Sequence, residues 1–221
     1  MTRLDEEIKK DIVDELYWDT RIDAAKVNVT VSGGVATLSG EVPTYGDLSA
    51  ARMAAWQIAG VVDVIDELRV AYVTPPTLPT DGEIESRVNS ILLWDPVIQD
   101  ADVSVTVVGG IVTLEGVVNT HWKRLLVEEK IAGIRGVLNI ENKLAVAPTE
   151  KIGDEYIAED VVAALDRDIN VSPEDVEVQV SNGVVRLFGT VPHWTARQAA
   201  ERDASLTAGV VDVQNELRLA A

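Results

Sequence analysis

The sequence offers few side chains of the kind that carry out catalysis. It contains no cysteine and only two histidines, His121 and His193, each at the predicted turn before a helix. Acid–base or metal chemistry at either histidine would need partner groups from elsewhere in the fold, so we interpret both as surface-turn residues. Three aspartates, Asp19, Asp95 and Asp168, recur at one repeat position after a predicted helix. Three equivalent carboxylates favour a shared capping or turn role, with a cation site as the alternative.

Motifs that bind phosphates or dinucleotides are also absent from the sequence. No Gly-x-x-x-x-Gly-Lys-Ser/Thr or Gly-x-Gly-x-x-Gly pattern follows a predicted strand. Thiolate metal sites need cysteine, which the chain lacks. The sequence therefore predicts no catalytic residue, no metal site and no cofactor, and we do not expect an enzyme.

Aromatic side chains form a more informative pattern. Trp18 and Trp94 occupy one repeat position, where the third repeat has Arg167. A second aromatic group gathers at the start of the second helix of each repeat. Tryptophan and tyrosine combine an apolar body with a polar tip, which suits contacts between modules, with another protein, or with lipid headgroups. The candidates for lipid or partner contact are Trp18, Trp94, Tyr45, Trp122, Lys123, Arg124 and Trp194.

A glycine-containing stretch that occurs three times must position these residues. It reads VSGGVATLSGEV at 31–42, VVGGIVTLEGVV at 107–118 and VSNGVVRLFGTV at 180–191. Each copy predicts two strands joined by a two-residue hairpin loop, in which Gly34, Gly110 and Gly183 adopt positive φ. A second glycine inside the following strand usually marks a bulge or a close backbone approach. It stands at Gly40, Gly116 and Gly189.

The residues around each hairpin predict one supersecondary unit, repeated without insertions. In the first copy Ile8, Ile12 and Leu16 lie on one face of a helix, and alternating valines at 27–31 predict a strand. After the hairpin, an alanine-rich helix at 48–58 precedes a third strand at 60–70. The predicted fold class is α+β, with three tandem αββαβ modules, each a three-stranded mixed sheet backed by two helices. The modules span residues 3–70, 81–146 and 154–219, with linkers at 71–80 and 147–153.

The charge of the chain excludes some classes of partner. Its 37 acidic and 19 basic residues give a net charge of −18, which repels nucleic acid and gives no attraction to anionic lipid. Any membrane contact should therefore be weak and peripheral, and should depend on Trp122, Trp194 and their neighbours. The sequence has no apolar run of about 20 residues and no signal-peptide pattern. We expect a cytoplasmic protein, or a periplasmic one if a leader has been removed.

The end of each repeat carries a family resemblance. It reads GVVDVIDEL at 60–68, GVLNIENKL at 136–144 and GVVDVQNEL at 209–217. With the preceding elements, this motif resembles the BON domain of bacterial osmotic-shock-induced and nodulation proteins. Asp66 departs from the asparagine at Asn142 and Asn215.

The resemblance implies stress-linked, phospholipid- or membrane-associating modules without enzymatic activity. The expected function is a non-enzymatic binding or scaffold protein that associates with phospholipid or envelope surfaces under stress. One alternative is an acidic, cation-associating protein that responds to osmotic or ionic conditions. Another is a protein–protein interaction module, and the oligomeric state stays open.

Overall fold

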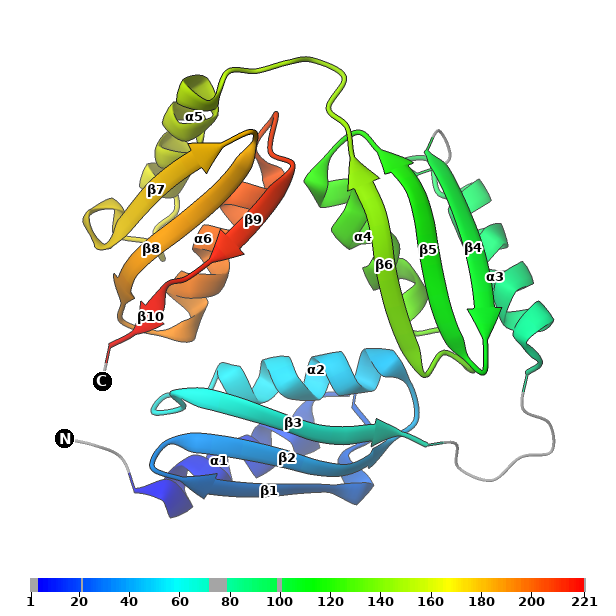
Figure 1. Ribbon diagram of the computed structural model, residues 1–221. Coiled ribbons are helices and arrows are strands. Elements are labelled where there is room, and N and C mark those ends of the chain that lie inside the picture. Colours follow the sequence, from blue (N-terminus) through cyan, green and yellow to red (C-terminus); the bar gives the residue numbers. More distant parts are fainter. Residues whose placement is uncertain (1–3, 21, 72–78, 99–100, 221) are drawn as a thin grey trace. The chain divides into compact units, whose positions relative to one another are not determined.

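The computed structural model describes residues 4–20, 22–71, 79–98 and 101–220, and these form three αββαβ modules (Figure 1). The predicted α+β class and the tandem arrangement are confirmed. Most of the predicted linker at 71–80 lies outside the described residues. The linker at 147–153 contains neither helix nor strand.

Module 1 shows the topology most simply. Its sheet has the order β1-β2-β3, in which β1 runs antiparallel and β3 runs parallel to the central strand β2. Its elements are α1 (Asp5–Trp18), the 3₁₀ turn η1 (Ala24–Lys26), β1 (Val27–Ser32), β2 (Val35–Val42), α2 (Tyr45–Trp56) and β3 (Asp63–Val70). A parallel third strand needs a crossover, and α2 supplies it.

Modules 2 and 3 repeat this order with one difference. Module 2 contains α3 (Asp81–Trp94), β4 (Asp102–Val108), β5 (Ile111–Val118), α4 (His121–Ala132) and β6 (Asn139–Val146). Module 3 contains α5 (Asp154–Arg167), η2 (Pro173–Asp175), β7 (Val176–Ser181), β8 (Val184–Val191), α6 (Trp194–Leu206), β9 (Asp212–Asn215) and β10 (Arg218–Leu219). The third strand of module 3 is interrupted at Glu216 and Leu217, and both of its pieces pair in parallel with β8. Module 3 therefore keeps the predicted mixed sheet, with its third strand in two pieces.

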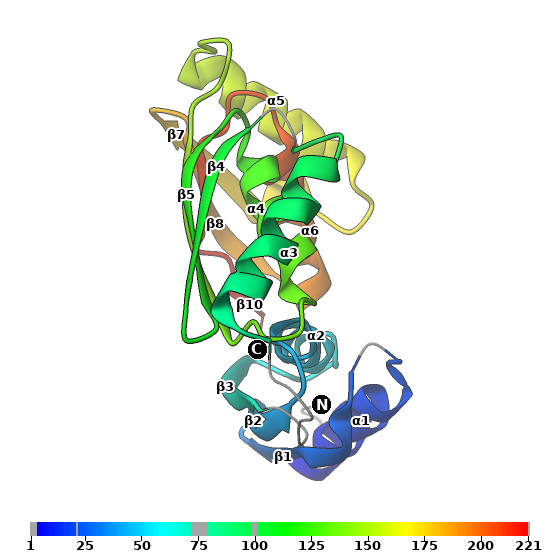
Figure 2. The ribbon, with the colours of Figure 1, turned by 90° about the vertical axis from the view of Figure 1, so that its right-hand side faces the viewer.

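Each module buries the apolar positions that defined the repeat. In module 1, Ile8, Ile12 and Leu16 of α1 are buried with Leu38 of β2. Small side chains of α2 complete this core, at Ala51, Ala54 and Ala55. Figure 2 shows α3 and α4 on the same side of the module 2 sheet, so the opposite face of that sheet carries no helix of its own module.

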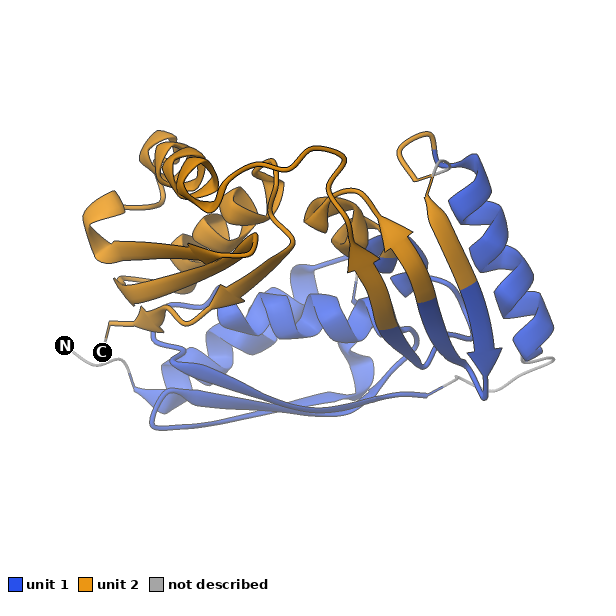
Figure 3. Cartoon of the chain, turned by 45° about the horizontal axis from the view of Figure 1, so that its top comes forward, with its two compact units in different colours: residues 1–95, 105–114, 128–141 blue, residues 96–104, 115–127, 142–221 orange. Residues whose placement is uncertain are grey.

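The density of contacts divides the chain into two compact units (Figure 3). The first unit comprises residues 1–95, 105–114 and 128–141, and contains the whole of module 1. The second comprises residues 96–104, 115–127 and 142–221, and contains the whole of module 3. The boundary passes through module 2, so the units do not follow the sequence repeats. Among the described residues, no helix combines the length and apolarity needed to cross a membrane.

Candidate functional site

The hairpin loop of each module is tied to the start of its first helix by an aspartate. In module 1 the Asp5 carboxylate accepts the backbone N–H of Gly33 at 2.8 Å and that of Gly34 at 3.1 Å. Asp81 and Asp154 do the same for the other two loops, at 2.8–2.9 Å. We call these three residues the hairpin-clamp aspartates. The same aspartate precedes each loop by 28 residues.

The glycines of the hairpin occupy the backbone conformations predicted for them. Gly34, Gly110 and Gly183 have φ of +79°, +78° and +75°. The strand glycines Gly40, Gly116 and Gly189 have φ of +119°, +129° and +131°. A Cβ added at these three would lie 1.9–2.0 Å from a backbone carbonyl oxygen of the neighbouring strand region. The strand glycines thus mark a close backbone approach, which fixes the first two strands against each other.

The two tryptophans at the ends of the first helices are exposed. Trp18 is 76% exposed at the end of α1, and Trp94 is 82% exposed at the end of α3. The Trp18 ring meets the ring of Tyr17 edge to face, with 5.1 Å between centroids. An exposed tryptophan presents an apolar ring and a polar N–H, which suits contact with a protein partner or a lipid headgroup. We call Trp18 and Trp94 the tryptophan tips.

The aromatic residues at the second-helix starts are more covered. Tyr45 and Trp194 are half-buried, and Trp122 is 38% exposed. Burial, together with the Glu128 carboxylate, raises the pKa of Tyr45 above its usual value. The guanidinium of Arg197 lies 4.9 Å from the centroid of the Trp194 ring. Tyr45 and Trp194 therefore already have protein neighbours.

The basic residues beside Trp122 differ from each other. Lys123 is half-buried, and its backbone N–H donates to the Thr120 hydroxyl at 3.2 Å. Arg124 lies 3.4 Å from the Asp212 carboxylate, so its charge is partly satisfied within the protein. The predicted contact site at Trp122, Lys123 and Arg124 stays a prediction.

The two histidines occupy different environments. His193 caps α6, since its Nδ1 accepts the Ala196 N–H at 3.3 Å. His121 is only 6% exposed, and its Nδ1 lies 3.2 Å from the Val211 carbonyl oxygen. The prediction of a surface-turn residue is therefore wrong for His121. Burial lowers the pKa of its imidazole, because desolvation disfavours the charged form.

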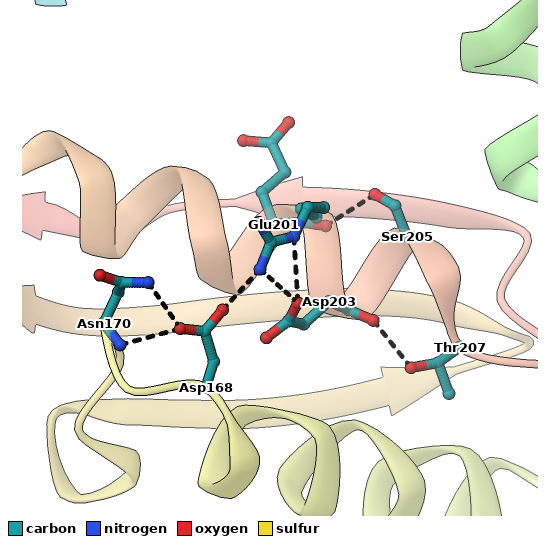
Figure 4. Close-up of polar contacts among 7 residues, drawn as sticks. Asp168, Asn170, Glu201, Asp203, Ser205 and Thr207 are labelled. Carbon is teal, nitrogen blue, oxygen red and sulfur yellow. Dashed lines mark hydrogen bonds and ion pairs between the residues drawn. The ribbon is translucent and has the colours of Figure 1, made fainter. Parts of the chain in front are cut away.

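The recurring aspartate after the first helix makes the predicted turn contacts in module 3 (Figure 4). One oxygen of Asp168 accepts both the backbone N–H and the side-chain amide of Asn170, each at 2.8 Å. The guanidinium of Arg202 bridges Asp168 and Asp203. The hydrogen bond from the Asn170 backbone lowers the pKa of Asp168, whereas burial raises that of Asp203. Asp168 and Asp203 border a depression of about 480 Å³ that Arg167 also lines.

The asparagine of the terminal motif joins the third strand to the second helix. Asn215 accepts the Leu217 N–H at 3.2 Å. Its amide donates to the Arg197 carbonyl at 3.2 Å and to the Glu201 carboxylate at 2.9 Å. In module 2, Asn142 accepts the Leu144 N–H and donates to the Arg124 carbonyl.

Module 1 modifies this junction. Asp66 accepts the Leu68 N–H at 2.9 Å, but a carboxylate has no amide hydrogens to donate. Arg52 stands at the repeat position of Glu128 and Glu201. The departure at Asp66 therefore comes with a reversal of charge on the facing helix.

Metal chemistry finds no support in the described part of the chain, where no group of three or more His, Cys, Asp or Glu side chains could hold an ion. The depression at Asp168 instead has Arg202 between its carboxylates.

Comparisons with known proteins agree with the repeat. A sequence model of the BON domain matches residues 4–72, 80–148 and 153–221. Osmotically-inducible protein Y of Escherichia coli (strain K12) is 29% identical over 144 residues, which cover 62% of this chain and 72% of that protein.

Two solved structures show a more distant likeness. CdsD, a structural protein of the type III secretion system of Chlamydia trachomatis, is 16% identical with a TM-score of 0.27, over 97% of this chain and 92% of that chain. The C-terminal domain of CdsD is 16% identical with a TM-score of 0.28, over the whole of both chains. Likenesses this distant carry no argument about function. The family match, in contrast, recurs in each αββαβ module over nearly the whole chain, and the protein belongs to the BON domain family.

Proposed function

We infer that this protein is a non-enzymatic, stress-related binding protein that associates peripherally with phospholipid surfaces through its tryptophan tips. The observation that carries the proposal is the exposure of Trp18 and Trp94 at equivalent helix ends. Tryptophan suits the boundary between water and lipid, because its apolar body enters the headgroup region while its N–H remains hydrated. The name of the Escherichia coli relative supports the stress-related part of the proposal.

The charge of the protein sets the strength and character of this association. With a net charge of −18, the protein is repelled by anionic headgroups. Binding must therefore come from apolar insertion, which salt does not weaken. Stable membrane anchoring ordinarily takes two strong signals, and two tryptophan tips supply only a weak, reversible attachment.

A vesicle flotation assay tests the proposal. The wild-type chain should float weakly with zwitterionic phosphatidylcholine vesicles at both low and physiological salt. The Trp18→Ala/Trp94→Ala variant should lose flotation, and Trp122→Ala/Lys123→Glu serves as the matched control at the second-helix site. Flotation abolished only in the control variant would move the contact to Trp122. Wild-type protein that never floats would refute lipid association.

Thermal unfolding of the same protein with added cations distinguishes the cation-association alternative from lipid association. The described residues contain no clustered set of metal ligands, so added calcium or potassium should leave the thermal midpoint unchanged beyond the effect of ionic strength. A saturable stabilisation by calcium at constant ionic strength would favour this alternative.

A further inference from the structure

We propose that module 1 binds a single unbranched aliphatic chain in a pocket between α1 and the start of β1. The pocket has a volume of about 330 Å³ and lies wholly within this module. Val13, Leu16 and Tyr17 of α1 form one wall, and Ala24, Ala25 and Val29 form part of the other. This inference does not rest on association with a lipid surface.

The pocket has an apolar base and an apolar lip. Leu16 and Val29 at its base are buried, at 2% and 6% exposure. Val13 and Tyr17 at its lip are 45% and 74% exposed. The edge-to-face contact with Trp18 holds the Tyr17 ring at this lip. A ligand in the pocket would therefore remove apolar surface from water on both sides of the opening.

The opening arises from small side chains that module 3 replaces with larger ones. Ala24 and Ala25 contribute only methyl groups to the wall. At the same repeat positions module 3 has Pro173 and Glu174, and it has Asp166 in place of Tyr17. The residues of module 3 therefore indicate which substitutions would fill the pocket of module 1 and make its lip polar.

The volume and the polar groups of the pocket limit what it can hold. A methylene group takes up roughly the volume of a water molecule, about 30 Å³, so the pocket accommodates a chain on the order of ten carbons. Asp23 is the one charged residue in its lining, and the Asp47 carboxylate accepts the backbone N–H of Asp23 at 3.2 Å. Among the described residues this corner is acidic, so the ligand should carry an uncharged or cationic head.

A chain-length series tests the pocket directly. Monomeric n-alkanols and n-alkyltrimethylammonium ions of six to twelve carbons are titrated into the full-length protein, and binding is followed by calorimetry and by the NMR shifts of the Ala24 and Ala25 methyls. The dissociation constant should fall about fourfold per added methylene up to about ten carbons, and then level off. Decanoate should bind more weakly than the matching ammonium ion.

Variants identify the site. Tyr17→Ala should weaken binding about tenfold by removing the lip, whereas Leu93→Ala at the same position of module 2 should not change it. Ala25→Glu, the residue of module 3, should abolish binding while circular dichroism shows a folded chain. Because Tyr17 is exposed, its variant decides the matter if Ala25→Glu fails to fold.

The outcomes separate this inference from the proposed function. Length-dependent alkyl binding in a protein that never floats with vesicles would uphold the pocket and refute lipid-surface association. If Tyr17→Ala loses both alkyl binding and flotation, the chain comes from a bilayer lipid; if it loses only alkyl binding, a free amphiphile is the ligand. Absence of length dependence, or unchanged affinity in Tyr17→Ala, would overturn the inference.

Discussion

Replacing Asp5 with alanine should destabilise module 1 by detaching its hairpin loop from α1. The carboxylate accepts two backbone N–H groups, an exposed one at Gly33 and a partly buried one at Gly34. A buried hydrogen bond to a charged group contributes about 1.5–3 kcal/mol, and solvent exposure reduces each of these two to about 1 kcal/mol. Adding the loss of a favourable charge in the first helical turn, about 0.3–1 kcal/mol, gives a total of about 2–3 kcal/mol.

Urea unfolding of the full chain, with hydrogen exchange at the Gly33 and Gly34 amides, measures this effect. Glu6→Ala is the matched control, because Glu6 shares the first turn and the charge of Asp5. The control should show only the dipole contribution, so the difference between the two variants isolates the clamp. Asp5→Asn keeps one acceptor oxygen and should fall between them. Equal destabilisation by Asp5→Ala and Glu6→Ala, with unchanged exchange at the two glycines, would refute the reasoning.

Three further substitutions address other features. Gly116→Ala should cost about 3 kcal/mol or more in urea unfolding, since its Cβ would collide with a backbone carbonyl, whereas Gly109→Ala, with open space around it, should cost about 1 kcal/mol; similar values would contradict the close approach. Asn215→Asp should lower the free energy of unfolding by about 2–3 kcal/mol, because it places a second carboxylate opposite Glu201. Adding Glu201→Arg should recover part of this loss. Additive effects of the two substitutions in a double-mutant cycle would count against the contact. His121 binds a proton more tightly in the unfolded state than in the fold, so this residue should reduce stability as the pH falls below about 6.5. The thermal midpoint of His121→Gln should therefore depend less on pH between about pH 6.5 and 5 than that of the wild-type chain. An unchanged pH dependence would argue against the burial of His121.

The fold could be predicted because its signals are local and occur three times. Alternating valines, helical spacing of Ile8, Ile12 and Leu16, and glycine pairs each depend on a few neighbouring residues. The hairpin-clamp aspartates were missed because their partners are 28 residues away. The recurrence of an aspartate at the same repeat position in all three modules was the available signal.

The interaction site was predicted in part. The sequence named Trp18, Trp94, Trp122 and Trp194 together, because side-chain type alone does not reveal coverage. Exposure separates the tryptophan tips from Trp194, over whose ring Arg197 lies. The burial of His121 could not be read from the sequence either, because it depends on Val211, 90 residues further along the chain. The pocket of module 1 was also missed, since a space between elements has no residue signature of its own.

The charge reversal from Glu128 and Glu201 to Arg52, which accompanies Asp66, has a consequence for how a chain of three similar repeats assembles. A third strand reaches its own sheet only after the crossover helix has formed, and neighbouring repeats offer competing edges during that time. If the strand of module 1 docked on module 2 or module 3, the facing helix would present Glu128 or Glu201 at the position where module 1 has Arg52. Opposed carboxylates would weaken such an exchange. Asp66 and Arg52 therefore mark the first repeat as different from its neighbours and disfavour swapping of its third strand with theirs.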